Sequence, residues 1–271
     1  STFTGGAGIN VLRDYCSEIP CGKASIKNST FEGLYHTPLI FYLAMIEITN
    51  SKFLNNQNGY WGPNPPLDHP GYCAHPHSSP CQTGGALFIS NYHTGSGVTT
   101  INDTEFTNNS TADYGGAIFF EGVRDCTVPY SDEETPCDPL NVTGFNPDHN
   151  LIIRNSVFTG NSSHRGAAIA IAKVKQGRGS FQRGNVLIEN TSFTDNIGVV
   201  NPDVPSSGGP IRAGNQETGF LISNPPADGY ETTIIAAGGN IDANNITLSG
   251  NSADQIIDAK GTLTCDPSCS Q

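Results

Sequence analysis

The sequence predicts an all-β protein: a single-stranded right-handed parallel β-helix of about seven or more coils with disulfide-stapled loop inserts. Three observations predict this fold. The 271 residues include 31 Gly, 18 Pro and 26 Asn but one Met. Residues that form turns are therefore abundant, and residues that favour helices are too scarce for a helical bundle. One short phrase built on Ile, Asn and Phe recurs along the chain, and a second phrase that begins Gly-Gly-Ala alternates with it.

The first phrase has an apolar residue, one free position, Asn or Asp, two more positions and then Phe, usually with Asn three residues later. Alternating apolar and polar residues are typical of short strands with one buried face, and Asn tolerates the left-handed backbone of a tight corner. Coils stacked about 4.8 Å apart would place Phe on Phe, Ile on Ile and Asn on Asn. The copies are 25–33, 47–56, 101–109, 153–161, 188–196 and 243–251, with Phe3 as a truncated first copy and Leu248 replacing Phe in the last.

The second phrase, whose Gly pair allows the backbone to turn tightly and pack closely, occurs at 84–90, 115–122, 166–172 and, more loosely, 208–214. Phe31 and Phe53 are 22 residues apart, which suits one coil of three short strands, whereas the later spacings of 53 and 52 residues require inserts. We expect one domain, 1–271, with inserts at about 57–83, 123–150 and 214–240. We also expect the chain to be a processed protein or a piece of a longer solenoid.

Eight cysteines fall in four close pairs separated by long stretches without cysteine. Each pair lies in a segment rich in Pro, Gly or Asp, and an even count in local pairs is typical of disulfides that staple loops in an oxidising compartment. The sequence therefore predicts an extracellular or cell-surface protein. The expected disulfides join Cys16 with Cys21, Cys73 with Cys81, Cys126 with Cys137, and Cys265 with Cys269.

Two signatures in alternating order carry a family resemblance: Gly-Gly-Ala-Ile/Leu at 84–87 and 115–118, and Phe-x-x-Asn at 53–56, 106–109, 158–161 and 193–196. They resemble the repeats of polymorphic outer-membrane-protein passenger domains and, more broadly, the pectin-lyase-like β-helix superfamily. The resemblance covers nearly the whole chain, from Phe3 to about Asp258. It implies a non-enzymatic surface role, because bacterial members of the family are adhesins or surface proteins secreted as passengers; fold alone settles no function.

The charge excludes two classes of partner. The net charge is −12 and no run of Lys or Arg occurs, so the basic contacts that bind nucleic acid phosphates or an anionic membrane are missing. The longest apolar stretch, 39–46, has eight residues, far short of the roughly 20 that cross a bilayer. We expect no nucleic acid partner and no membrane span.

No catalytic residue and no cofactor is expected. The seven Arg are scattered singly, unlike the clustered basic groups of β-helix lyases, and no Asp-Asp pair offers the two carboxylates of a glycosidase. His and Cys residues at 69–81 have the chemistry of a Zn²⁺ site, and acidic residues at 132–138 that of a Ca²⁺ site. A disulfide-closed loop and a solvated face are the simpler interpretations. The alternative function is an enzyme or binder that acts on neutral polysaccharide, with the inserts as cleft walls.

Eight Asn-x-Ser/Thr sequons are candidate N-glycosylation sites. A side chain that faces inward as part of a hydrogen-bonding ladder cannot carry a glycan, so the sites expected off both ladders are the better candidates. If the corner Asn instead faces outward, glycans would line one edge of the stack. The corner sites are Asn28, Asn190 and Asn245, the phrase-ending sites are Asn109 and Asn161, and the sites expected off the ladders are Asn141, Asn108 and Asn102.

These features predict a non-catalytic, structural or adhesive β-helical glycoprotein. A β-helix that begins at Phe3 presents an open sheet edge with unpaired backbone groups. We expect neighbouring repeats of a longer chain or another copy to cover it, the latter giving a head-to-tail fibre. Carbohydrate is the other partner considered.

Overall fold

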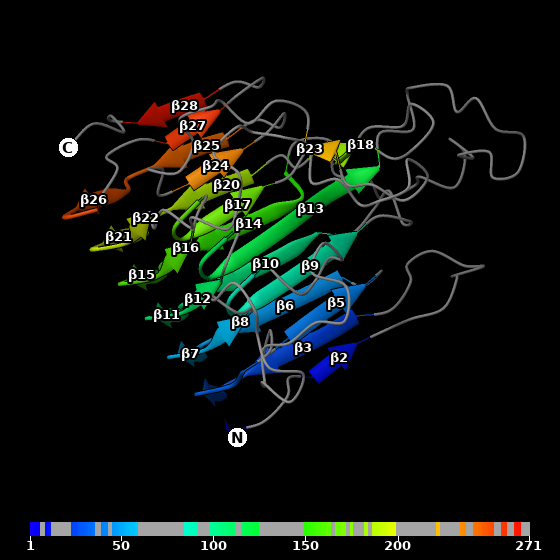
Figure 1. The fold of residues 1–271 in the computed structure, drawn as a ribbon. Coiled ribbons are helices and arrows are strands. Elements are labelled where there is room, and N and C mark those ends of the chain that lie inside the picture. Colours follow the sequence, from blue (N-terminus) through cyan, green and yellow to red (C-terminus); the bar gives the residue numbers. More distant parts are fainter. Residues whose placement is uncertain are drawn as a thin grey trace, which may run out of the picture.

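The computed structural model describes residues 1–5, 9–11, 23–35, 39–42, 45–58, 84–91, 98–111, 115–124, 149–163, 166–171, 174–175, 182–183, 186–198, 221–222, 234–236, 241–251, 256–258 and 263–266. All regular elements in these ranges are strands, so none of the described residues forms a helix that could cross a membrane. The strands stack as coils with the two chain ends at opposite ends of the stack (Figure 1). The predicted parallel β-helix is confirmed.

Two seven-stranded parallel sheets carry the first phrase, sheet 1 with its Ile and sheet 2 with its Phe. Side chains in both sheets alternate between the interior and the outer face, as the period-two pattern predicts. Sheet 1 consists of β3 (Lys23–Lys27), β6 (Met45–Thr49), β10 (Thr99–Asn102), β14 (Leu151–Arg154), β20 (Val186–Glu189), β25 (Ile241–Asn244) and β28 (Leu263–Asp266). Sheet 2 consists of β1 (Thr2–Thr4), β4 (Thr30–Glu32), β7 (Lys52–Leu54), β11 (Glu105–Thr107), β15 (Val157–Thr159), β21 (Ser192–Thr194) and β26 (Thr247–Ser249).

Two further sheets complete the coils, and the four strands of sheet 3 belong to four of them. Sheet 3 is short and consists of β8 (Gln57–Asn58), β12 (Ser110–Thr111), β16 (Ser162–Ser163) and β22 (Ile197–Gly198). Sheet 4 consists of β2 (Ile9–Val11), β5 (Leu39–Tyr42), β9 (Leu87–Asn91), β13 (Ile118–Arg124), β17 (Ile169–Ile171), β24 (Ile234–Ala236) and β27 (Ile256–Asp258), with β19 (Gln182–Arg183) antiparallel to the end of β13. A separate antiparallel pair joins β18 (Val174–Lys175) to β23 (Leu221–Ile222).

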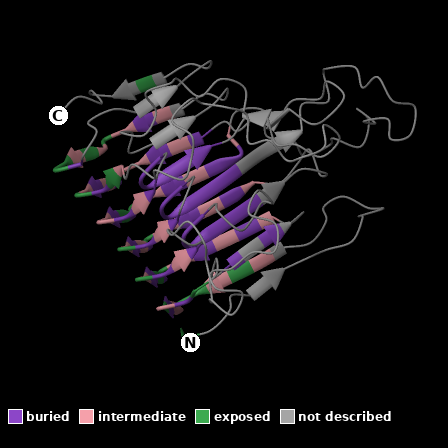
Figure 2. Ribbon diagram, viewed as in Figure 1, coloured by how far each residue is buried: buried purple, intermediate pink, exposed green. Residues whose placement is uncertain are grey.

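The interior is filled by identical residues stacked on one another, as the repeat predicts. The Phe rings of sheet 2 lie parallel, with centroids 4.7–5.0 Å apart, and Leu248 continues the column in β26. The rings from Phe31 to Phe193 are at most 2% exposed. Figure 2 shows the buried residues as a band that runs through the middle coils of the stack. The order of this column is Phe3, Phe31, Phe53, Phe106, Phe158 and Phe193.

Sheet 4 differs from the prediction of one buried face. Consecutive residues of β9, β13 and β17 are buried on both sides, including Phe88 and Phe119, whose rings stack at 5.5 Å. Apolar runs without polar alternation, such as those at 86–89 and 117–120, are typical of strands covered on both faces.

The Gly pair that precedes these strands has two separate roles. Gly115 lies at φ +69, a left-handed backbone that favours glycine, and the preceding coil repeats this at Gly84, φ +68. Gly116 lies against the next coil, because a Cβ there would be 2.0 Å from the Ala167 carbonyl oxygen. The first glycine is therefore required by the turn and the second by the close approach of neighbouring coils.

The described strands also refine the predicted inserts. Gln57–Asn58 form β8 at the start of the first, and β13 runs to Arg124 at the start of the second. The strand that follows β17 in sheet 4 is β24, inside the predicted third insert, whereas the Gly-Gly-Pro phrase at 208–214 lies outside the described residues.

The length of each coil varies only on one side. The apolar position of sheet 1 and the Phe position of sheet 2 are five residues apart in all six complete copies, from Ile26 and Phe31 to Ala243 and Leu248. The long segments that separate successive described strands lie on the other side. Each of them comes directly before or after a strand of sheet 4, or next to a strand of the antiparallel pair β18–β23. Examples are 59–83, 125–148 and 199–220.

Replacing Gly116 with Ala should destabilise the stack by roughly 1–3 kcal/mol, because the new methyl group overlaps the backbone of the next coil. Gly33→Asn is the matched control. Gly33 has φ +64 with open space around it, and Asn55 and Asn108 hold the same corner at φ +54. Chemical denaturation should show a lower midpoint for G116A and almost no change for G33N, and equal midpoints would contradict the close approach.

Candidate functional site

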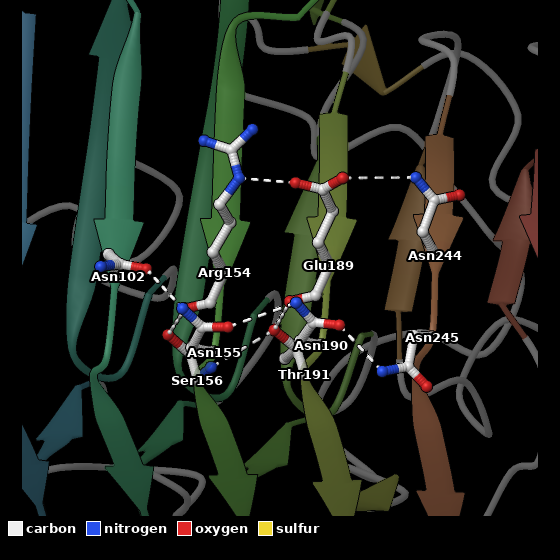
Figure 3. Close-up of polar contacts among 9 residues, drawn as sticks. All are labelled: Asn102, Arg154, Asn155, Ser156, Glu189, Asn190, Thr191, Asn244 and Asn245. Atoms are coloured by element: carbon white, nitrogen blue, oxygen red, sulfur yellow. Dashed lines mark hydrogen bonds and ion pairs between the residues drawn. The ribbon is translucent and has the colours of Figure 1, made fainter.

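The first corner of each coil, between sheets 1 and 2, carries an exposed row of amides that we call the outer ladder. Its residues have left-handed backbone, with φ between +48 and +51. Asn50 Nδ2 donates to Asn28 Oδ1 at 2.7 Å, and Asn245 Nδ2 donates to Asn190 Oδ1 at 2.8 Å. The corner positions are Asn28, Asn50, Asp103, Asn155, Asn190 and Asn245, all exposed (Figure 3 shows the last three with Asn102).

One coil has an Asp at this corner, and Asn102 compensates for it. A carboxylate cannot donate a hydrogen bond, so Asp103 cannot continue a row of amide donors. Asn102 Nδ2 donates to Asp103 Oδ2 at 2.6 Å, and Asn102 Oδ1 accepts from Asn155 Nδ2 at 3.1 Å. The prediction that Asn102 lies off the ladders is therefore wrong.

Directly after the outer ladder, buried hydroxyl groups close the same corner. The Ser156 hydroxyl donates to the Arg154 carbonyl at 2.7 Å and accepts from the Thr104 amide of the preceding coil at 3.2 Å. Ser51 and Thr191 make the equivalent bond to the carbonyl two residues earlier. Each hydroxyl adds a second hydrogen bond to a backbone carbonyl that already accepts a backbone N–H from the preceding coil. This role was not predicted, although Ser or Thr follows the corner Asn in most copies.

The second corner, between sheets 2 and 3, also requires left-handed backbone. Every residue there has φ between +53 and +64 and is Gly, Asn or Asp. Asn108 Nδ2 donates to Asn55 Oδ1 at 3.3 Å, and both side chains are exposed. Asn108 therefore lies at a separate corner, off the outer ladder, where two adjacent Asn residues bond to each other. The corner positions are Gly5, Gly33, Asn55, Asn108, Gly160, Asp195 and Gly250.

The next residue in each coil forms a second, fully buried row of amides that we call the inner ladder. Asn109 shows its pattern: Nδ2 donates to Asn161 Oδ1 at 3.0 Å and to the Phe53 carbonyl at 2.9 Å. Asn109 Oδ1 accepts from the Nδ2 and the backbone N–H of Asn56. The two donor protons and both acceptor sites of the amide are thus used inside the stack. The ladder residues are Asn56, Asn109, Asn161, Asn196 and Asn251, from 0% to 7% exposed.

Ion pairs join the coils on their outer faces. Lys52 and Glu105 lie opposite each other in β7 and β11, with Nζ and Oε2 2.8 Å apart. Arg154 Nε donates to Glu189 in the neighbouring strand of sheet 1, and the other carboxylate oxygen of Glu189 accepts from Asn244 (Figure 3). The hydrogen bond from Lys52 lowers the pKa of Glu105, and that from Arg154 lowers the pKa of Glu189. Lys27 and Glu47 form the other ion pair among the described residues, and His149 Nε2 lies within hydrogen-bonding distance of Asp242 Oδ2, 2.7 Å away.

The predicted modification sites therefore separate into three groups. Asn109 and Asn161 are buried with both amide protons used. Asn102 is half-buried, and its sequon partner Thr104 is buried and donates to the Asn102 carbonyl. The exposed sequons are Asn28, Asn108, Asn190 and Asn245, while Asn141 lies outside the described residues.

The predicted disulfides lie almost entirely outside the described residues. Cys265 is placed only by its backbone in β28. None of the four pairs therefore has both of its cysteines in the described part of the chain, and the pairing stays a prediction. The cysteines outside the described ranges are Cys16, Cys21, Cys73, Cys81, Cys126, Cys137 and Cys269.

The two metal alternatives fall on similar segments. His69, with the rest of its His- and Cys-containing loop, and the acidic segment 132–138 lie outside the described residues. Within the described ranges no group of three or more His, Cys, Asp and Glu residues could hold a metal ion.

Replacing Asn109 with Leu should lower the free energy of unfolding by roughly 3 kcal/mol or more, because four buried side-chain hydrogen bonds are lost and their partners stay buried. Asn108→Gly is the matched control. It changes the neighbouring, exposed corner to the residue found at Gly160 and should cost less than about 1 kcal/mol. Urea denaturation compares the two, and a larger effect of N108G would contradict a stabilising inner ladder.

Arg154→Met should raise the pKa of Glu189 towards its ordinary value, because the hydrogen bond that favours the carboxylate is removed. A carboxyl with a lowered folded-state pKa stabilises the fold above its ordinary pKa, and this contribution disappears as the pH falls through the lowered value. Carbon-13 NMR titration of the Glu carboxyls measures the change. Lys52→Met is the control: it should shift Glu105 and leave Glu189 unchanged.

A family model, that of the Chlamydia polymorphic membrane protein repeat, matches residues 103–121. The matched segment begins at the first corner and includes β11, the second corner, β12, the Gly115–Gly116 turn and part of β13. The matched segment therefore contains Phe106 of the Phe column, Asn109 of the inner ladder and the Gly115–Gly116 pair. The match supports the predicted resemblance to polymorphic outer-membrane-protein repeats at this coil. No curated protein and no solved structure matches the chain.

Proposed function

We propose that this chain is a non-catalytic β-helical module of an extracellular or cell-surface glycoprotein, with a structural or adhesive role. The observation that supports it most directly is the use made of the polar side chains. Amides and hydroxyls of the described corners bond to neighbouring coils, and each Lys or Arg ion pair among the described residues joins two different coils. Groups committed to holding coils together are poorly placed to act as an acid, a base or a nucleophile.

The repeat match supports the proposed location. Residues 103–121 are similar to a repeat found in membrane proteins. The local cysteine pairs and the sequons of the chain are features typical of a secreted protein. Four disulfides, each closing one local cysteine pair, are part of the proposal.

The outer face of sheet 2 is a suitable adhesive surface. Thr107, Thr159, Thr194 and Ser249 occupy the same register position in four successive coils, and all are half-buried or exposed. A repeated row of hydroxyls offers hydrogen bonds to a polar partner such as carbohydrate, and the Thr107 hydroxyl, which donates to Glu105, can still accept one. Val157, 41% exposed, adds an apolar contact on the same face.

A direct test separates this role from the polysaccharide-active alternative. The 271-residue chain is incubated with a panel of neutral polysaccharides, and both retention and product release are measured. We expect retention on cells or glycans without turnover. Turnover that a single Asp or Glu substitution abolishes would overturn the proposal. The heat-unfolded chain, measured in the same retention assay, is the control for non-specific attachment.

Exposure supports a choice among the sequons. We place N-glycans at Asn28, Asn108, Asn190 and Asn245, where the amides point to solvent at the corners. Each outer-ladder bond uses one of the two Nδ2 protons, and an N-linked glycan replaces one proton and leaves the other, so ladder and glycan are compatible. Asn109 and Asn161 need both protons inside the stack and should stay unmodified.

Site occupancy can be read after secretion from a eukaryotic host. Enzymatic deglycosylation in heavy-oxygen water converts each occupied Asn to labelled Asp, and peptide mass mapping locates the label. Label is expected at the four exposed sites and not at Asn109 or Asn161. Label at either buried site in the folded, secreted protein would contradict the inner ladder. Asn28→Gln serves as a matched loss of one exposed site.

A further inference from the structure

Two of the exposed sequons meet in the folded chain. Asn190 and Asn245 are 55 residues apart in the sequence, yet they occupy the same corner of two adjacent coils. Backbone pairing sets Glu189 opposite Asn244, and the Asn190 N–H donates to the Asn244 carbonyl at 3.0 Å. Asn245 Nδ2 donates to Asn190 Oδ1 at 2.8 Å, so the two amides lie side by side (Figure 3). Folding therefore brings together two sites that are separate in the unfolded chain.

The two side chains also leave the corner in the same direction. Their backbones have nearly the same φ, +49 at Asn190 and +51 at Asn245, and both side chains are exposed. Each amide donates towards the preceding coil, Asn190 to Asn155 at 3.4 Å and Asn245 to Asn190. Equivalent atoms of neighbouring coils are about 4.8 Å apart. Glycans on the two amides would therefore begin side by side at this spacing.

Such a spacing leaves no free space between the two innermost sugars. Carbon atoms in contact lie about 3.5–4.0 Å apart. Sugars whose stems begin about 4.8 Å apart are thus separated by a gap of about 1 Å, which is narrower than a water molecule about 2.8 Å across. An enzyme whose active site must enclose one stem therefore collides with the other.

Asn108 provides an isolated site for comparison within the same chain. It is an exposed corner residue with φ +54, and its amide donates to Asn55 of the preceding coil at 3.3 Å. Asn55 is not in a sequon, because Gln57 stands two residues after it. The same corner of the following coil is Gly160. A glycan on Asn108 therefore has no glycan beside it at either neighbouring corner.

We propose that Asn190 and Asn245 carry a pair of N-glycans that the fold brings into contact and that shield each other from enzymes. The inference rests on the proposed glycan positions and adds a contact between two of them. Because the sequons are 55 residues apart, each can be modified separately before the coils stack, and the contact arises on folding. The pair forms one carbohydrate patch at the start of β21 and β26.

The test measures how fast each glycan is removed from the folded chain. The 271-residue chain is secreted from cells that leave N-glycans in the oligomannose form, and material with both sites occupied is treated with an endoglycosidase that cleaves between the two innermost sugars. Peptide mass mapping follows each site over time. We expect cleavage at Asn190 and Asn245 to be several times slower than at Asn108. The three rates should become equal once the chain is unfolded.

Single substitutions test whether one glycan shields the other. Thr247→Ala destroys the sequon of Asn245 but keeps the Asn245 amide in the outer ladder. Cleavage at Asn190 should then become as fast as at Asn108. Ser110→Ala, which destroys the sequon of Asn108, is the matched control and should leave cleavage at Asn190 slow. Circular dichroism confirms that each variant keeps its strands.

The outcomes separate this inference from the proposed glycan positions. Equal cleavage rates at the three sites of the folded, fully occupied chain would overturn the pairing alone. Slow cleavage at Asn190 that persists in the Thr247→Ala variant would also overturn it, because the protein surface and not the second glycan would then be the shield. Absence of glycan from both Asn190 and Asn245 would instead overturn the proposed positions themselves, and with them the pair.

Discussion

The inner ladder is the interaction on which the rest of the structure depends. The buried amides of Asn56, Asn109, Asn161 and Asn196 each bond to the amide of the next coil and to the Phe-position carbonyl of the preceding one. Each of them therefore fixes the spacing and the phase of three coils together. A slip of one residue would place a corner amide inside and a Phe outside, and it would leave buried donors unpaired. The Phe column, the two corners and the cross-coil ion pairs all follow from that phase. The coil before Asn56 has Leu34 in place of Asn, and its backbone N–H still donates to Asn56.

The repeated phrase was sufficient to predict the stacked architecture and the residues in the Phe and Ile columns, because residues at equal positions must coincide when coils of parallel strands stack. It left open whether the corner Asn faces inward or outward, and it separated Asn109 from Asn108 only by their places in the phrase. Asn108 and Asn109 are adjacent and chemically identical, yet one lies at φ +54 in solvent and the other is fully buried. That difference depends on the backbone turn between them. Asn102 shows a second limit, since its role follows from Asp103 beside it and not from its own place in the phrase.

Sheet 4 shows where a sequence pattern loses its meaning. Its strands are buried on both faces at Phe88 and Phe119, so the alternation of apolar and polar residues cannot predict which side chains face the interior. The strand that follows β17 in this sheet, β24, also comes well after the last Gly-Gly phrase in the sequence. By contrast, the ion pairs Lys52–Glu105 and Arg154–Glu189 could have been found by aligning the phrase copies, because each pair occupies one column. The candidate site is therefore predictable where the backbone is repetitive and unpredictable where long segments intervene.

The constant spacing between sheets 1 and 2 has a consequence for how such a chain can change. Six coils keep five residues across the first corner, whereas the segments beside sheet 4 range from a few residues to more than twenty. One side of the rod is thus held constant by the ladders, and the other tolerates additions at little cost in loop entropy. New recognition loops can arise on that side, and repeats can be gained or lost as whole coils, without disturbing the register of the existing ones. The stacking of coils, which sets the length of the rod, thus depends on the side of sheets 1 and 2, whereas new contacts can be added on the side of sheet 4.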